Sequence, residues 1–190
     1  MSDQNSDMYL RPTAIMDSDH PAVQAYAREM VGDAADPVER AVRLYLAVRD
    51  DIRYDPYAPF YLPEHYQASK VLEGRRSFCI PKAALLCALG RAVGIPARIG
   101  FADVRNHLAT RQLLDYLGSN LFVYHGYADL FLEGKWVKAT PAFNRELCER
   151  HLAAWKRAYG EARIEGWIKR LAEGGMETGR DFAREEVYRS

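Results

Sequence analysis

The stretch of sequence that decides the fold is CIPKAALLCALGRAVGIPARIGFAD, residues 79–103. Its first part predicts a buried helix from Cys79 to Val93, because Pro81 suits a first helical turn and the residues after it are largely apolar. The side chains expected inside the protein are those of Ala83, Leu85, Leu86 and Leu89. Pro96 lies beyond the end of this helix, and ARIGFAD, residues 97–103, predicts a strand. A central helix that begins at a cysteine and leads into a strand is therefore the framework for the rest of the chain.

Two further helices are expected before the central one, each with a proline at its start. The first begins after Asp19 and ends at Gly32, which is a typical stop residue. The second is capped by Asp36 and continues to about Asp51. Its start signal is the stronger of the two, since Glu39 is placed to act as a capping-box partner.

The remaining segments are less regular in pattern. Residues 52–66 hold three Pro and five Tyr or Phe, which predicts an irregular segment packed onto the body of the protein. Residues 104–120 predict a mixed, largely helical connection, and residues 145–190 predict one or two amphipathic helices. We therefore expect a core domain over residues 1–144, in which residues 1–8 are disordered, followed by a helical extension.

A β-hairpin is the clearest local prediction. Two β-like runs, residues 121–132 and 135–140, flank Glu133-Gly134, which suits a two-residue turn. This turn places Asp129 opposite Lys138, so the two are expected to pair. Strand alternation predicts one shared face for Leu121, Val123, His125, Tyr127, Asp129 and Phe131. Helices followed by strands favour an α+β domain with an antiparallel sheet.

Composition excludes several classes of protein. The chain has 190 residues, 48% of them hydrophobic, and 26 Lys+Arg balance 26 Asp+Glu. Such a chain can bury a core, and its zero net charge argues against a nucleic-acid partner. A signal peptide is basic first and then apolar, whereas the first twenty residues of this chain are acidic. No signal peptide is therefore expected. No run is long enough to span a membrane, so we expect no membrane partner. We expect a cytoplasmic protein with reduced cysteines.

Among the three cysteines, Cys79 is the candidate for chemistry. The N-terminus of a helix stabilises a thiolate through its partial positive charge and its unpaired N–H groups. Arg75, Arg76 and Lys82 are close in sequence and are expected to add positive potential. The structural alternative is that Cys79 is only a small buried apolar residue, which is the interpretation we keep for Cys87 and Cys148.

A thiol nucleophile needs a base, and His125 is the best placed of the five histidines. It lies within a predicted strand, which can hold an imidazole rigidly against a helix terminus. The hairpin register makes Thr140 and Asn144 its neighbours on the same face, whereas Asp129 is about 13 Å along the strand. Taken alone, a histidine in a strand is more often structural than catalytic.

Three segments resemble the transglutaminase-like superfamily of cysteine peptidases and acyltransferases. They are ERAVRLYLAVRDDIRYDPY (39–57), ASKVLEGRRSFCIPKAALLCALGRAVGIPARIGFAD (68–103) and HGYADLFLEGKWVKATPAF (125–143). The second is the most specific, because the family places its nucleophile before a helix that leads into GIPAR. The resemblance implies a papain-like α+β core, with the nucleophile at the N-terminus of a central helix packed on an antiparallel sheet. By position, it makes Cys79 the nucleophile and His125 the base.

The chain departs from the family pattern at the third catalytic position. Where the family usually has an Asp after the hairpin tryptophan, this sequence has Thr140. Thr140 is therefore the expected third member, and Asn144 is the alternative, by analogy with Cys-His-Asn enzymes. An oxyanion hole would combine backbone N–H groups at Cys79 with a side chain from the preceding segment, for which Gln67 and Tyr66 are the candidates.

The expected function is acyl transfer through a thioester on a peptide, protein or small amide substrate. The resemblance favours a bacterial-type peptidase or amidase over a cross-linking enzyme, since the chain is short and lacks acidic calcium-binding clusters. No cofactor and no metal are expected. The oligomeric state is left open.

Two other hypotheses belong to different classes. In the first, the fold has lost catalysis and acts as a protein-binding module, with the helical tail that carries Trp155 and Trp167 as the contact surface. In the second, Cys79, His107 and His125 hold a metal ion, although the chain has none of the short ligand spacings that usually preorganise such a site.

Overall fold

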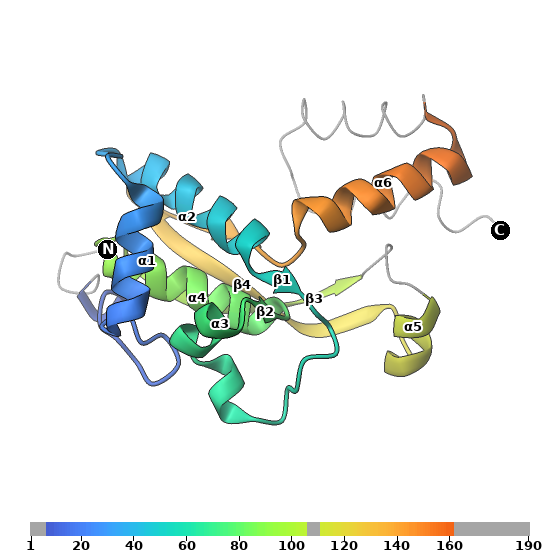
Figure 1. The fold of residues 1–190 in the computed structure, drawn as a ribbon, viewed down its shortest axis with the longest axis horizontal. Helices are drawn as coiled ribbons and strands as arrows, with labels where there is room; N and C mark the ends of the chain where they lie inside the picture. The colour runs from blue at the N-terminus through green and yellow to red at the C-terminus, as the bar shows by residue number, and fades with distance from the viewer. Residues whose placement is uncertain (1–6, 106–110, 162–190) are drawn as a thin grey trace. The chain divides into compact units, whose positions relative to one another are not determined.

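The computed structural model describes residues 7–105 and 111–161. Its centre is helix α4 (Cys79–Ala92), whose residues from Ala83 to Leu89 are all fully buried. Figure 1 shows α4 in the middle of the core, with strand β4 (Leu121–Leu132) passing behind it. The other elements that pack on α4 are α1 (Pro21–Val31), α2 (Pro37–Asp51), α3 (Ala68–Gly74) and β3 (Ala97–Arg105). A helix that is apolar all round is stable only when it is enclosed in this way.

The first two helices have the ends that the sequence predicts. The side chain of His20 accepts from the N–H of Ala22 at the start of α1, and Gly32 ends the helix with a φ of 53°. At the start of α2, the carboxylate of Asp36 accepts from the N–H of Glu39 at 2.9 Å. The carboxylate of Glu39 forms an ion pair with Arg43 at 2.7 Å, so it does not complete the expected capping box.

The sheet is antiparallel with the strand order β3-β4-β5, where β5 is Lys135–Ala139. Glu133 and Gly134 have φ values of 50° and 79°, which are the positive values that a two-residue hairpin turn requires. Asp129 lies opposite Lys138, which confirms the predicted hairpin register. The whole is the α+β arrangement that the sequence predicts.

Two details of the hairpin differ from the prediction. Asp129 forms its ion pair with Arg98 of β3 at 3.2 Å, while the Lys138 ammonium lies 4.9 Å from the centre of the Tyr127 ring. The prediction that Asp129 pairs with Lys138 is therefore wrong. The prediction used only the register of the two hairpin strands. Arg98 lies directly opposite Asp129 on β3, the other strand that neighbours β4.

The second difference is a β-bulge in β4. Ala102 pairs with His125, but the next pair along the ladder is Val104 with Phe122, so β4 contains one extra residue here. Tyr124 has a φ of 56°, and its N–H donates to the carboxylate of Asp103 at 3.1 Å. The bulge shifts the alternation by one residue, so the predicted single face from Leu121 to Phe131 is interrupted before His125.

The short elements in the region before α4 were not predicted from the sequence. Strands β1 (Arg53–Tyr54) and β2 (Arg76–Ser77) pair in parallel, with Tyr54 beside Ser77. A 3₁₀ helix, η3 (Pro63–Tyr66), and α3 lie between them. The N–H of Asp55 donates to the carbonyl of Ser77 at 2.9 Å. This pairing brings the otherwise irregular segment 52–66 next to the start of α4.

The chain divides into two compact units, Met1–Leu147 and Cys148–Ser190. Helix α6 (Arg145–Tyr159) begins where the helical extension was expected. Asp7–Tyr9 form the 3₁₀ helix η2, so the prediction of disorder is wrong for residues 7 and 8. Residues 1–6 and 162–190 lie outside the described residues, as does the second part of the predicted tail. Within the described ranges, no helix is both long and apolar enough to cross a bilayer.

The sheet packs closely against the start of α4 at Gly126. A Cβ atom on Gly126 would lie 2.7 Å from the Cα of Ile80 and 3.2 Å from its nitrogen. Both are backbone atoms at the first turn of α4, so neither can rotate away. Only glycine allows β4 to touch the start of α4, in the residue next to His125.

Gly126→Ala is therefore expected to destabilise the protein by about 2 kcal/mol, because β4 and α4 must move apart. Urea unfolding followed by circular dichroism measures the change. Gly74→Ala is the matched control, because a Cβ at Gly74 meets nothing within 4 Å. The control should be as stable as the wild type or slightly more so. Equal stability of the two variants would contradict the close contact.

Candidate active site

Cys79 is the first residue of α4 and is partly buried. Phe78, which precedes it, provides no side-chain cap. Burial raises the pKa of the Cys79 thiol, and the backbone N–H groups of Gly126, Ile80 and Cys79 itself act in the opposite direction. Burial is the larger effect, so the net pKa lies above the ordinary value and the thiol is protonated at neutral pH.

The charged residues expected to activate Cys79 are engaged elsewhere. Arg75 stacks on the ring of Tyr26 at 4.8 Å, and Arg76 forms an ion pair with Asp55 at 2.7 Å. Lys82 is fully buried, and it donates to backbone carbonyls at the end of α2. Among the described residues, no cation contributes to the pKa of Cys79. The expectation that these three charges favour the thiolate is therefore wrong.

His125 is buried in β4, and it directly precedes Gly126, whose N–H acts on the Cys79 sulfur. Burial lowers the pKa of His125 below its ordinary 6.5, so the imidazole is neutral at pH 7. Gly126 and Ile80, which contact each other, are the chain neighbours of a neutral imidazole, His125, and of a neutral thiol, Cys79. Such a pair suits a general base that takes the proton during attack, rather than a preformed ion pair.

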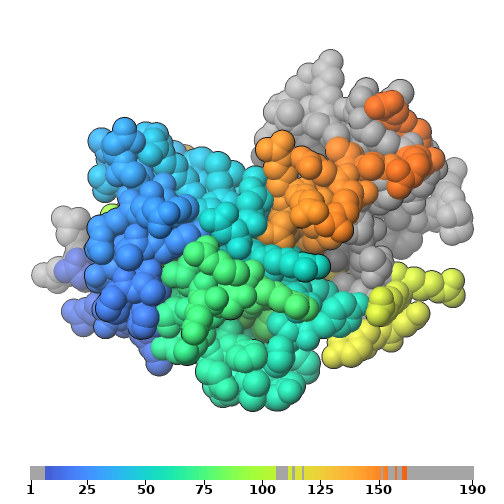
Figure 2. All heavy atoms as spheres, viewed as in Figure 1, coloured from blue at the N-terminus to red at the C-terminus, as the bar shows by residue number. Residues whose placement is uncertain are grey.

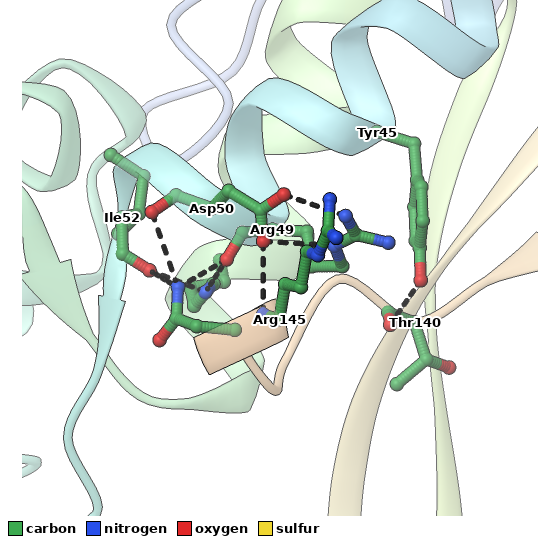
Figure 3. Close-up of polar contacts among 8 residues, drawn as sticks. Tyr45, Arg49, Asp50, Ile52, Thr140 and Arg145 are labelled. Carbon is green, nitrogen blue, oxygen red and sulfur yellow. Dashed lines mark hydrogen bonds and ion pairs between the residues drawn. The ribbon is translucent and has the colours of Figure 1, made fainter. Parts of the chain in front are cut away.

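Thr140, the expected third member, is exposed and follows the last residue of β5. Its backbone carbonyl accepts from the hydroxyl of Tyr45 at 3.4 Å (Figure 3). In the part of the chain that the structure describes, no hydrogen bond joins the Thr140 hydroxyl to His125. Its catalytic role stays a prediction.

Asn144, the alternative third member, is buried and bonded to the main chain at both ends of its amide. Its Oδ1 accepts from the N–H of Tyr54 at 2.5 Å. Its Nδ2 donates to the carbonyl of Ile52 at 2.8 Å and also to that of Arg49. The amide of Asn144 therefore ties the segment after β5 to the junction between α2 and β1, and its role as a partner of His125 stays a prediction.

Lys82 and Asn144 share their acceptors. The Nζ of Lys82 donates to Ile52 at 2.5 Å and to Arg49 at 3.0 Å, on the same two carbonyls. Figure 3 shows these carbonyls beside Asp50, whose carboxylate accepts from the N–H of Arg145 at 3.0 Å. Carbonyls at the end of a helix have no partner within the helix, so these donors satisfy groups that would otherwise be buried and unpaired.

The cost of burying Lys82 is visible in its pKa. Burial lowers the pKa of the ammonium from the ordinary 10.5 to about 7, and the opposing attraction of Asp50 is smaller. Arg49 adds to the lowering. A large part of the population therefore carries a neutral amine at position 82 near neutral pH, one helical turn after Cys79.

Of the two predicted oxyanion donors, Tyr66 lies near the sulfur. Burial raises the pKa of Tyr66, and the charge of Cys79 raises it further. Its hydroxyl, however, donates to the carbonyl of Phe60 at 2.7 Å. Gln67 precedes α3 and makes no side-chain capping bond there. Tyr54, which sequence reasoning missed, is also within electrostatic reach of Cys79.

Several aromatic side chains are exposed to solvent. Tyr57 and Tyr116, the latter on α5 (Arg111–Leu117), meet edge to face with ring centres 5.7 Å apart. Figure 2 shows the segment 55–66, in teal, reaching toward the yellow atoms of α5. Other large apolar side chains at least half exposed are Met8, Val42, Phe60, Tyr61, Phe101, Val123 and Tyr124.

The hypothesis of a metal site cannot be placed on the structure in full. His107 lies outside the described residues, whereas Cys79 and His125 are described. Within residues 7–105 and 111–161, no three His, Cys, Asp or Glu side chains gather closely enough to hold a metal ion.

Comparison with protein families identifies the fold. The family model of the transglutaminase-like superfamily matches residues 24–141, which include Cys79 and His125. The chain belongs to this superfamily. No curated protein matches the chain.

Solved structures share the fold at low sequence identity. A proposed cysteine protease from Cytophaga hutchinsonii is 19% identical with a TM-score of 0.59, and the match covers 74% of this chain and 43% of that one. The periplasmic domain of TgpA from Pseudomonas aeruginosa is also 19% identical, with a TM-score of 0.51 and coverage of 87% and 53%. The superfamily member described here thus matches only about half the length of these structures.

Lys82→Met should change how stability depends on pH. The pKa of Lys82 is about 7 in the folded protein and 10.5 ordinarily, so the unfolded chain binds more protons between these values. The free energy of unfolding of the wild type therefore gains up to about 1.4 kcal/mol per pH unit in this window from Lys82 alone. The variant lacks this gain. The free energy of unfolding of the wild type, relative to that of the variant, should therefore increase from about pH 7 to pH 9. Urea unfolding at several pH values tests this.

Lys70→Met is the control for this measurement. Lys70 is exposed, and its hydrogen bond with Glu73 raises its pKa, so it is protonated in both states over the same range. Its stability difference from the wild type should not change with pH. A constant difference for Lys82→Met as well would contradict a neutral buried lysine.

Proposed function

We propose that this chain catalyses acyl transfer on an amide or peptide bond, with Cys79 as nucleophile and His125 as general base. The observation that supports this most is the contact at Gly126, which brings the residue next to His125 against the first turn of α4. The membership of the superfamily supports the same roles. A peptide, a protein or a small amide is the proposed substrate.

The proposed reaction starts from the neutral pair. His125 accepts the proton of the Cys79 thiol while the sulfur attacks the carbonyl carbon, and the π electrons move onto the carbonyl oxygen. The resulting oxyanion collapses, the C–N bond breaks, and the amine leaves with the proton from His125. Water then attacks the thioester and gives its proton to His125. The thiolate leaves, regains that proton, and the carboxylic acid is released.

Hydrolysis and cross-linking differ only in the molecule that attacks the thioester in the second step. Attack by water gives a peptidase or amidase, and attack by an amine gives a transglutaminase. We propose hydrolysis, in line with the structural neighbour that is itself a proposed cysteine protease. Adding a primary amine such as cadaverine to an acylated sample distinguishes the two outcomes, because only cross-linking chemistry gives an amide product.

A second candidate function is a binding module without catalysis. The raised pKa of Cys79 and the Thr at position 140 favour it, since both weaken an activated thiolate. The two proposals differ in one measurable property. Only the enzyme requires His125 for acylation of Cys79.

Acylation by p-nitrophenyl acetate should depend on both residues. The wild type should release p-nitrophenol with an acetyl group found on Cys79 by mass spectrometry, and Cys79→Ser should lose this acetylation. His125→Ala should slow it by roughly 100-fold or more, because general-base catalysis is lost. Cys148→Ser, which removes an exposed thiol, is the control and should match the wild type. Equal acetylation in His125→Ala would favour the binding module.

The same reaction should have the pH profile of a neutral pair. Because burial lowers the pKa of His125 below its ordinary value and raises that of Cys79 above its own, the neutral pair predominates in the pH range between these two ordinary values. The acylation rate should therefore be flat over this range and fall only at more acidic pH, as His125 becomes protonated. His65→Gln should leave the profile unchanged. A rate that declines above pH 7.5 would indicate a thiolate–imidazolium pair and contradict the neutral one.

A further inference from the structure

Tyr54 is held beside the nucleophile by three separate contacts. Its backbone pairs with Ser77 of β2, two residues before Cys79. Its N–H donates to the Oδ1 of Asn144 at 2.5 Å. Its ring meets that of Phe143 edge to face, with centres 4.9 Å apart. Contacts with β2 and with the segment after β5 thus hold Tyr54 in place, although it lies in an otherwise irregular segment.

The hydroxyl of Tyr54 is the part that these contacts leave unused. Among the described residues, it has no hydrogen-bond partner, whereas the hydroxyl of Tyr66 is bonded to Phe60. The oxygen of this hydroxyl is not fully buried, so solvent can reach it. A rigidly held phenol with a free O–H near a nucleophile can donate to a bound substrate.

We propose that Tyr54 is a catalytic residue that donates its phenolic hydrogen to the oxyanion formed when Cys79 attacks an acyl carbonyl. Together with the backbone N–H groups at Cys79 and Gly126, it completes the oxyanion hole. This inference rests on the proposed function. It replaces Gln67 and Tyr66 as the proposed side-chain donor, because the hydroxyl of Tyr66 already donates to the carbonyl of Phe60.

The electrostatics of Tyr54 suit a donor. Burial raises the pKa of Tyr54 well above its ordinary value, and the charges of Cys79 and Asp55 raise it further. The phenol is therefore protonated at every pH at which the enzyme would work. It donates a hydrogen bond without giving up its proton, so the proton balance between Cys79 and His125 is unchanged.

Asn144 is the residue that positions Tyr54. Its Oδ1 holds the N–H of Tyr54, and its Nδ2 is anchored on Ile52, whose carbonyl also accepts from Lys82 of α4. The side chain of Asn144, which holds Tyr54, and the helix that carries Cys79 thus share one acceptor, the carbonyl of Ile52. This arrangement gives Asn144 a function that is distinct from orienting His125.

Two reactions of Cys79 test the role of Tyr54. Acetylation by p-nitrophenyl acetate passes through an oxyanion, whereas alkylation by iodoacetamide does not. Tyr54→Phe should slow acetylation by roughly 100-fold, as expected for the loss of one oxyanion-hole donor. The rate of alkylation and its pH dependence should not change. Tyr66→Phe is the matched control and should affect neither reaction.

Each outcome separates the inference from the proposed function. If the wild type shows no His125-dependent acetylation, both fail. If it does and Tyr54→Phe acetylates at the wild-type rate, only the role of Tyr54 fails. If alkylation and acetylation slow together, Tyr54 acts on the thiol itself and the oxyanion role is overturned. The phenylalanine keeps the packing on Phe143, and an unchanged urea midpoint verifies that the variant is folded.

Discussion

The contact between Gly126 and Ile80 is the constraint on which the site depends. It joins a strand to the first turn of the most deeply buried helix, and the absence of a side chain at Gly126 sets how closely they meet. His125 and Cys79 are each the neighbour, along their own element, of one residue in this contact. The backbones that carry the two proposed catalytic residues are thus held together by close packing.

A second constraint is electrostatic and lies on the other side of α4. The carbonyls at the end of α2 accept hydrogen bonds from the Nζ of Lys82 and the side-chain amide of Asn144, which come from two distant parts of the sequence. Burying a lysine is expensive unless its donors are satisfied, and here backbone carbonyls satisfy them. The helix that begins at Cys79, the segment that carries Tyr54 and the segment after the hairpin are therefore linked through one small group of carbonyls.

The sequence predicted the elements that have strong periodic or capping signals. Helices α1, α2 and α4 and the 133–134 hairpin lie where the spacing of apolar residues and the turn residues placed them. The pairing of β1 with β2 could not be predicted, because strands of two residues carry no periodic signal. The partner of Asp129 and the bonds of Asn144 were missed for a related reason. Each depends on a neighbour from a different part of the fold, which local patterns do not specify.

The bulge at Tyr124 has a consequence for how such a domain can vary. Its extra residue is accommodated in the sheet and fastened by the Asp103 carboxylate, so a change of length beyond it need not be transmitted to His125. The outer end of the β3–β4 ladder can therefore be remodelled during evolution while the inner end keeps its register. The bulge thus separates the length of the outer ladder from the position of the strand that carries His125.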